Sequence, residues 1–176
     1  LGKSPIRDAI RELVGIGLLV NNPNKGTLVS EPITKNEIIE IFEIRYMLEG
    51  QAAFNATQRI GPEGIEQLEA INNKIKQLDR SSSVDFFIIN KNLHKTFYQF
   101  SNRPFLLRLI EQIWDQIMLF RIVYPYAPEA IDVCADDHHQ IIKAVKAKNP
   151  GLAQKRLVAH LKKGLTNLLK QIQING

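Results

Sequence analysis

Proline and glycine divide the chain from residue 34 onward into helix-length segments, and this punctuation constrains the fold more than any other feature. Each segment carries apolar residues at helical spacing, and the breaks between segments are short. Helices joined in this way pack antiparallel to their neighbours, so an all-α bundle is expected. We predict about six helices, over residues 34–60, 65–78, 84–100, 106–123, 128–148 and 150–174.

The first 30 residues follow a different pattern. Ser4 and Pro5 are typical of a helix start, with Ser4 as the cap and Pro5 in the first helical position. Two short β-prone runs, 18–20 and 27–29, then flank a polar turn with a basic tip, which predicts a hairpin. A helix followed by such a hairpin is the second half of a winged helix, and residues 30–32 are typical of a linker.

The fold class that we predict is therefore mostly α. A partial N-terminal winged helix over 1–30 precedes an antiparallel all-α bundle over 31–176. The composition, with 44% hydrophobic and 23% charged residues, is that of a well-packed soluble chain. No apolar run approaches the roughly 18 residues of a membrane span. The N-terminus lacks the pattern of a secretory signal, and the single cysteine, Cys134, fits a reducing cytoplasm.

The charge balance is a weaker guide to function. The chain carries 23 basic and 18 acidic side chains, a net charge of +5. That excess is compatible with an acidic partner such as DNA, but many soluble proteins carry a similar charge for solubility alone.

Three of the four histidines fall on helix faces where apolar residues are expected. These are His94, His138 and His160, whereas His139 shares its face with charged side chains. Asn90 precedes His94 by four residues, so both side chains point the same way from adjacent turns. Converging inside a bundle, such donors would suit Zn²⁺ or another borderline divalent ion. Spacing alone leaves a plainer alternative open, in which each histidine is hydrogen-bonded to a backbone carbonyl.

Several blocks of the chain resemble, in order, the GntR superfamily of transcriptional regulators. Residues 4–20 (SPIRDAIRELVGIGLLV) are similar to the recognition helix and following strand, and 24–29 (NKGTLV) to the wing tip. Residues 43–53 (EIRYMLEGQAA) resemble the first helix of the FCD-type ligand-sensing domain of the FadR subfamily. Residues 137–145 (DHHQIIKAV) and 159–161 (AHL) are similar to later blocks of that domain.

The resemblance implies DNA contacts in the first 30 residues. A recognition helix needs long donors near its N-terminal end, and a wing needs a basic tip beside a glycine that permits close backbone approach. The residues that match are Lys3, Ser4, Arg7, Lys25 and Gly26. About two helices precede the recognition helix in this family, so the chain holds only part of a DNA-binding module. Without the resemblance, the same charges would be read as an ordinary solvated surface.

The resemblance also implies a metal site. Members that bind metal carry an Asp or Asn four residues before a histidine, then two more histidines 22 residues apart. Asn90, His94, His138 and His160 satisfy that pattern. Asn in place of the commoner Asp removes one negative charge and should weaken the site. Zn²⁺ is the expected ion, with Ni²⁺ as an alternative.

A small carboxylate effector could complete the coordination of such an ion. Arg45, in the first bundle helix, is placed to bind that carboxylate bidentately, and Arg121 is a weaker candidate. We therefore expect a cytoplasmic, metabolite-responsive transcriptional regulator that binds a DNA operator as a homodimer.

Two alternatives remain open at this stage. A three-histidine ion is also how zinc hydrolases activate water, but such enzymes keep a carboxylate nearby as general base. No Asp or Glu shares the inward stripes of the three histidines, and Asp137 points roughly 100° away from His138 on its helix. We therefore expect no enzyme activity. The second alternative is a regulator that binds its effector without metal, and Asn90 keeps that possibility open.

Overall fold

The structure is a computed structural model that describes residues 3–15, 17–30 and 34–175. Its first elements are the helix α1 (Lys3–Gly15) and the strands β1 (Leu19–Asn22) and β2 (Gly26–Val29), which together form the N-terminal unit. The strands pair antiparallel, as predicted, with Leu19 opposite Val29 and Asn22 opposite Gly26.

The hairpin turn follows from its sequence. The side-chain oxygen of Asn22 accepts hydrogen bonds from the backbone N–H groups of Asn24 at 2.9 Å and Lys25 at 3.1 Å. Gly26 has a φ of +79°, a left-handed conformation that glycine adopts without steric cost. A three-residue loop closed by a left-handed glycine is a common hairpin connection. The loop therefore places the Lys25 side chain at its tip.

One prediction in this region is wrong. Helix α1 begins at Lys3, so Ser4 lies in its first turn and not before it. A helix start is the least certain part of a sequence-based prediction, because helix ends shift by one or two residues. Of the predicted linker, Glu31 and Pro32 lie outside the described residues. None of the residues described between Pro5 and Ser30 is buried.

The bundle consists of six helices, as predicted. Thr34 caps the first of them through a capping box, in which Thr34 and Glu37 exchange hydrogen bonds. Proline occupies the first position of four of the helices, where its missing N–H leaves no helical bond unmade. The helices are α2 (Lys35–Arg59), α3 (Pro62–Gln77), α4 (Ser83–Gln99), α5 (Pro104–Val123), α6 (Pro128–Lys146) and α7 (Pro150–Asn175).

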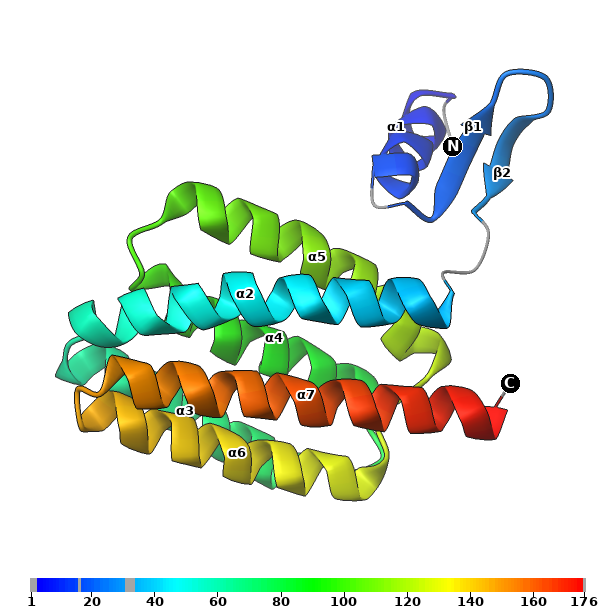
Figure 1. Cartoon of the computed structure of the whole chain (residues 1–176). Coiled ribbons are helices and arrows are strands. Elements are labelled where there is room, and N and C mark those ends of the chain that lie inside the picture. Colours follow the sequence, from blue (N-terminus) through cyan, green and yellow to red (C-terminus); the bar gives the residue numbers. More distant parts are fainter. Residues whose placement is uncertain (1–2, 16, 31–33, 176) are drawn as a thin grey trace.

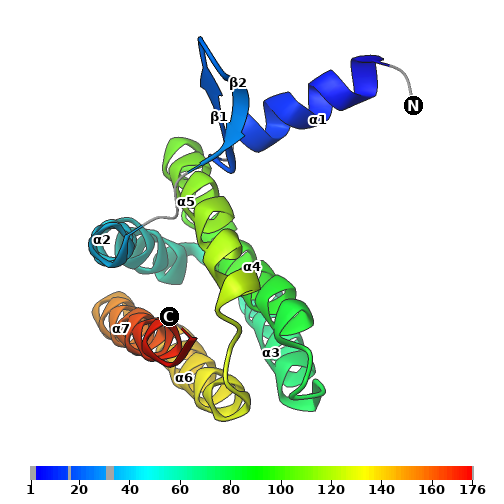
Figure 2. The ribbon, with the colours of Figure 1, turned by 90° about the vertical axis from the view of Figure 1, so that its right-hand side faces the viewer.

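The six helices form a closed ring around a common interior. Successive neighbours around the ring are α2, α7, α6, α3, α4, α5 and again α2, and α2 also packs on α4 across it. Figure 2 looks along the bundle and shows α2, α7 and α6 on one side and α5, α4 and α3 on the other, while the N-terminal unit stands beside one end of the bundle (Figure 1). Among the described residues, no helix has both the length and the apolar character to span a membrane.

Small residues bring α2 and α7 close together. A Cβ added at Gly50 would lie 3.3 Å from Val158 Cγ2, so a larger side chain there would force the helices apart. Ala52, Ala53 and Ala56 continue this buried strip along α2. Apolar side chains fill most of the space between the helices. Most of the buried polar side chains among them belong to the candidate site.

Candidate metal centre

Three imidazole rings meet inside the ring of helices. His94 comes from α4, His138 from α6 and His160 from α7, and all three are buried. Their ring centroids lie 5.2 Å (His94–His138), 5.3 Å (His94–His160) and 4.7 Å (His138–His160) apart. One ligand atom from each lies within 4.8 Å of the other two. His139 is exposed, as its charged neighbours predicted.

The hydrogen bonds of His94 determine which ring nitrogen carries its proton. Tyr98 Oη donates to Glu49 Oε2 at 2.6 Å, because a carboxylate can only accept. Tyr98 Oη must therefore accept from His94 Nδ1, which lies 2.9 Å away. This leaves Nε2 of His94 with a lone pair, and that buried atom has no hydrogen-bond partner within the described part of the chain.

The other two histidines follow the same arrangement. His138 Nδ1 lies 3.3 Å from the side-chain oxygen of Asn72, whose amide group is oriented by donating to the backbone oxygen of Ala135 at 3.0 Å. His160 Nδ1 lies 3.6 Å from Asp137 Oδ2, slightly beyond hydrogen-bond length. Acceptors therefore lie on the Nδ1 side of each ring, and the Nε2 atoms face inward, where those of His138 and His160 contact, among the described residues, only the sulfur of Cys134.

Burial keeps two of these rings neutral. Desolvation lowers the pKa of His94 and His138 well below the ordinary histidine value, and the neighbouring imidazoles lower both pKa values further. A neutral imidazole is the form that binds a metal ion, so the site needs no deprotonation of these rings at neutral pH.

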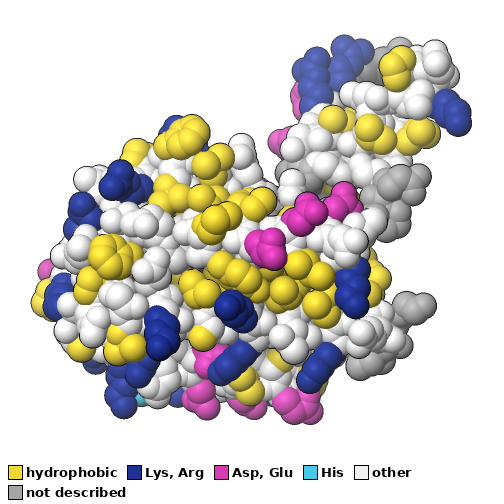
Figure 3. Space-filling model, viewed as in Figure 1, with side chains coloured by type: hydrophobic (Ala, Val, Ile, Leu, Met, Phe, Trp, Pro, Cys, Tyr) yellow, Lys and Arg dark blue, Asp and Glu magenta, His cyan; other side chains and the backbone are white. Residues whose placement is uncertain are grey.

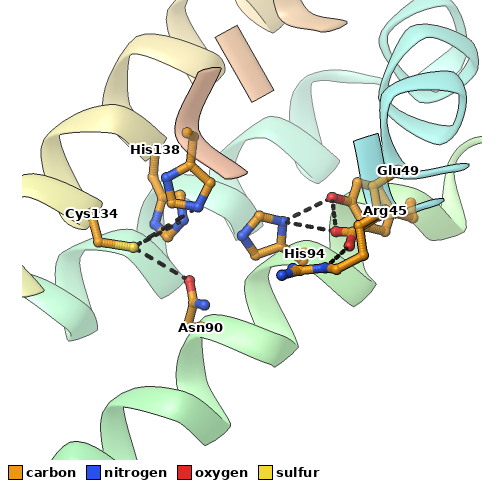
Figure 4. Close-up of polar contacts among 8 residues, drawn as sticks. Arg45, Glu49, Asn90, His94, Cys134 and His138 are labelled. Atoms are coloured by element: carbon orange, nitrogen blue, oxygen red, sulfur yellow. Dashed lines mark hydrogen bonds and ion pairs between the residues drawn. The ribbon is translucent and has the colours of Figure 1, made fainter. Parts of the chain in front are cut away.

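Two further donors lie beside the imidazoles (Figure 4). The side-chain oxygen of Asn90 is 3.7 Å from Cys134 Sγ, and the same sulfur lies 3.7 Å from His138 Nε2 and 4.0 Å from His160 Nε2. Burial raises the pKa of the Cys134 thiol well above its ordinary value. Asn90 thus reaches the cluster that the sequence predicted, and Cys134 reaches it without having been predicted as a donor.

The residues present fit a divalent ion of borderline softness. Three imidazole nitrogens with inward lone pairs are a common ligand set for Zn²⁺ and its neighbours. Each ring is also oriented by an acceptor on its other nitrogen, as metal-bound histidines are. Without an ion, the buried and unpartnered Nε2 of His94 would carry an uncompensated desolvation cost.

Two carboxylates lie close to the histidines, although neither shares an inward helix stripe with them, as predicted. Asp137 approaches His160 because the packing of α6 on α7 brings its face toward α7, which the stripes of a single helix do not reveal. Glu49 comes from α2 and lies 3.8 Å from His94 Nδ1. Both lie on the Nδ1 side of a ring, where they orient the imidazole and do not face the inward nitrogens.

A cavity of about 570 Å³ opens next to the imidazoles. Its lining includes His94, His160, Asn90, Trp114 and Arg121, so it connects the cluster with a large aromatic ring and a cation. Its size is in the range of pockets that take small organic ligands.

Arg121 is buried in this cavity with its charge unpaired. It donates to the backbone oxygen of Gly164 at 3.1 Å and to Asn167 Oδ1 at 3.4 Å, and its guanidinium lies 3.7 Å from the centre of the Tyr126 ring. Its Nε has no partner, and no carboxylate within the described ranges forms an ion pair with it. Burial lowers the pKa of Arg121, which remains a cation.

Arg45 also lines the cavity, but its charge is already paired. Its Nε donates to Glu49 Oε1 at 2.6 Å, and its guanidinium lies between the rings of Phe42 and Trp114, at 4.6 and 4.7 Å from their centres. In the sequence analysis Arg45 was the stronger candidate for binding an anion and Arg121 the weaker one. The contacts favour the reverse order, because Arg121 lacks an anionic partner.

The predicted DNA contacts lie in the N-terminal unit. Arg7 and Lys25 are exposed, and Gly26 follows the hairpin tip. Lys3 and Ser4 belong to the first turn of α1, but their side chains are outside the described part of the structure. Figure 3 shows Lys and Arg side chains on the α1 side of this unit and at the outer edge of the hairpin.

Comparison with known proteins gives the family. The FCD domain model matches residues 40–163, which include most of the bundle. The chain is 28% identical over 149 residues to the HTH-type transcriptional regulator McbR of Escherichia coli K12, a match that covers 83% of this chain and 67% of McbR. The solved structure of E. coli McbR/YncC superposes with a TM-score of 0.80 at 24% identity, covering 96% of this chain and 85% of that one, and it shows the same fold.

A second relative has been solved in two states. The FCD domain of TM0439, 25% identical to this chain, is known in a metal-free form (TM-score 0.65, covering 82% of this chain and 99% of that one) and in a Zn²⁺-bound form (TM-score 0.62, covering 81% and 98%). Together with the match over residues 40–163, these likenesses point to a regulator and not to an enzyme family. The chain belongs to the FCD-domain family of GntR-type transcriptional regulators.

Proposed function

We propose that this regulator senses a small carboxylate through a divalent ion held inside the bundle. Residues 31–176 would form the sensor, and residues 1–30 would contribute to the DNA-binding unit. The observation that carries the proposal is the convergence of three buried imidazoles whose ligand atoms lie within 4.8 Å of one another. The ligands of the ion would be Asn90, His94, His138 and His160.

The ligand types favour Zn²⁺, with Ni²⁺ as the second candidate. A bound ion would supply positive charge that attracts a carboxylate oxygen. The relative TM0439 is named as Zn²⁺-bound in one of its two forms, which supports the same ion for this chain.

Arg121, which lines the same cavity as the imidazoles, would bind the effector's carboxylate. A buried guanidinium without an anionic partner is costly, and a carboxylate ligand would offset that cost. Arg45 remains a second candidate, although any new anion would compete there with Glu49. The preferred effector is thus a small organic acid with one oxygen for the ion and another for Arg121.

Effector binding would reach the DNA through α2. Phe42 and Arg45 bring α2 into the cavity wall, and α2 is the first helix after the N-terminal unit. A ligand that repositions these side chains would bias the placement of α2 and of the unit before it. In a homodimer, such a shift would change how two units meet two operator half-sites.

A thermal denaturation series with matched variants tests the metal part of the proposal. At a zinc concentration of about 100 Kd, binding should stabilise the wild-type protein by about 2.7 kcal/mol. That gain should raise Tm by roughly 5–10 °C for a chain of this length, and EDTA should reverse it. His138→Ala should abolish the shift. His139→Ala, which replaces the exposed neighbouring histidine, should leave the shift intact. If metal-treated wild type melts like chelated protein, the metal-free alternative replaces this proposal.

The effector part has its own test. Zinc-loaded protein is titrated calorimetrically with a panel of small acids that includes malonate, citrate and lactate. At least one acid should bind, and Arg121→Gln should weaken it by 1.5–3 kcal/mol, about 10- to 150-fold. Arg108→Gln, an exposed arginine on the same helix, is the control. Equal affinities in wild type and Arg121→Gln would rule out this role for Arg121.

A further inference from the structure

We propose that Cys134 is an additional ligand of the same ion, binding as a thiolate and supplying the negative charge that Asn90 lacks. This inference rests on the proposed metal site, and it concerns which residue completes that site. The pattern of Asn90 and three histidines assigns no role to Cys134, which is the single cysteine of the chain.

The position of the sulfur matches that of a ligand atom. Cys134 Sγ lies 3.7 Å from His138 Nε2 and 4.0 Å from His160 Nε2. Zinc–sulfur bonds of about 2.3 Å and zinc–nitrogen bonds of about 2.0–2.1 Å, at a tetrahedral angle, separate the two ligand atoms by about 3.6 Å. Cys134 and His138 are four residues apart on α6, so one helix face presents both donors.

A second, independent observation marks the same space as a ligand site. The buried Nε2 of His94, from the opposite helix α4, has no partner among the described residues, and its ring edge faces the other two imidazoles and Cys134 (Figure 4). The side-chain oxygen of Asn90 lies 3.7 Å from the sulfur. Donors from three further side chains thus surround the thiol: two imidazoles of its own half of the bundle and the Asn90 amide.

Charge gives the reason why a thiolate is needed. Three imidazoles and an amide are neutral, so a divalent ion held by them alone would keep its full charge in a buried site. The nearby carboxylates approach the rings from the Nδ1 side, since Glu49 pairs with Arg45, Asp137 Oδ1 pairs with Lys163 at 2.6 Å, and Asp137 Oδ2 lies 3.6 Å from His160 Nδ1. Among the described residues, the group of mutually close ligand atoms consists of the three imidazoles alone, without Asp or Glu, and the Cys134 sulfur joins it through His138 and His160. The Cys134 thiolate would therefore be the anionic ligand.

The binding step involves no redox change. A metal–sulfur bond forms, the S–H bond breaks, and the proton passes to solvent. A sulfur ligand makes the donor set softer, so the site should prefer Zn²⁺, Co²⁺ and Cd²⁺ to hard ions such as Mn²⁺.

Cobalt spectroscopy on the whole chain, kept reduced, tests the inference. Co²⁺ added to wild type should produce visible ligand-field bands together with an intense sulfur-to-cobalt charge-transfer band in the near ultraviolet. Cys134→Ser, which preserves the size of the side chain, should keep the visible bands and lose the ultraviolet band. Its Cd²⁺ affinity should fall by roughly tenfold or more, the scale on which ligand-sphere changes act. Val133→Ala, an exposed neighbour on α6, is the matched control and should match wild type in both readouts.

The outcomes separate this inference from the proposed function. Visible bands without an ultraviolet band in wild type would overturn the role of Cys134 while leaving the histidine site in place. No cobalt bands at all would overturn the proposed metal site and this inference with it. If Cys134→Ser fails to fold, the wild-type spectrum decides, because no other residue of the chain can supply a thiolate.

Discussion

At the scale of single residues, the site depends on side chains that never face the ion position. Tyr98 and Glu49 orient His94, Asn72 orients His138, and their contacts leave each inward nitrogen with a lone pair. A hydrogen bond on Nδ1 both holds the ring in place and selects the tautomer that can bind a metal.

Removing the Tyr98 hydroxyl should therefore weaken metal binding. In Tyr98→Phe, His94 Nδ1 loses its acceptor and Glu49 loses a donor. We expect zinc affinity to fall by about 10- to 100-fold, measured by competition with a chromophoric chelator. Tyr46→Phe, a half-buried tyrosine of α2, should retain the wild-type affinity. Equal affinities in both variants would show that the ring needs no such support.

The metal-free protein should lose stability in mild acid. The pKa values of His94 and His138 are lowered in the folded state, so below about pH 6.5 the unfolded chain binds more protons than the folded one. The free energy of unfolding should then fall by up to about 1.4 kcal/mol per pH unit for each of the two rings. Urea denaturation between about pH 8 and about pH 5 measures this slope, which His138→Gln should roughly halve. A flat profile for the wild type would contradict the burial of two neutral imidazoles.

The sequence predicted which histidines come together better than which side chains orient them. Helical spacing separated the three buried histidines from His139 because burial follows the face of one helix. Asn72 could not be found in this way, since it lies 66 residues from His138 and meets it only through the packing of α3 on α6. Cys134 precedes His138 by four residues and so shares its helix face, but spacing alone gives no sign that its sulfur comes within 4.0 Å of two imidazoles.

At the scale of elements, close helix contacts hold the ring of helices together. Gly64, in the first turns of α3, packs under the ring of Phe100 at the end of α4. An added Cβ would lie 2.5 Å from Phe100 Cζ and 2.7 Å from Ile60 Cγ1, closer than atoms can pack. The junction between these helices therefore depends on the absence of a side chain.

Gly64→Ala should destabilise the bundle. Overpacking of this kind costs about 1–3 kcal/mol, which exceeds the gain of up to about 1 kcal/mol from the better helix propensity of alanine. Gly151→Ala is the control, because the nearest atom to its Cβ would be Asn149 Oδ1 at 3.9 Å. Urea denaturation midpoints compare the two. An equal or higher midpoint for Gly64→Ala would mean that the α3–α4 junction is looser than described.

The elements themselves were largely predictable. Proline and glycine breaks are local signals, so all six bundle helices and the hairpin were predicted near their observed positions. The order of the helices around the ring was not predictable, because it depends on which faces pack together. That order brings α4, α6 and α7 together at one point.

At the scale of the whole molecule, sensing and DNA binding are assigned to different parts of the chain. The imidazole cluster and the cavity lie within the bundle, and the exposed basic residues Arg7 and Lys25 lie in the N-terminal unit (Figures 1 and 3). The FCD match at residues 40–163 falls within the bundle. The two parts can therefore be tested separately.

Lys25→Ala should reduce the electrostatic part of DNA binding. Each lost phosphate contact lowers the slope of log affinity against log salt by about 0.9 on duplex DNA. Fluorescence anisotropy with a labelled non-specific duplex at several salt concentrations measures the slope. Lys155→Ala, an exposed lysine of α7, should leave it unchanged. An unaltered slope for Lys25→Ala would remove the hairpin tip from the DNA interface.

Diffraction from zinc-soaked crystals, with anomalous data collected on both sides of the zinc edge, would locate any ion held by the three histidines. We expect one strong peak inside the bundle, at about 2.0–2.1 Å from the Nε2 atoms of His94, His138 and His160. Three imidazoles without an anomalous peak between them, or with zinc bound only at the protein surface, would contradict the proposed metal site.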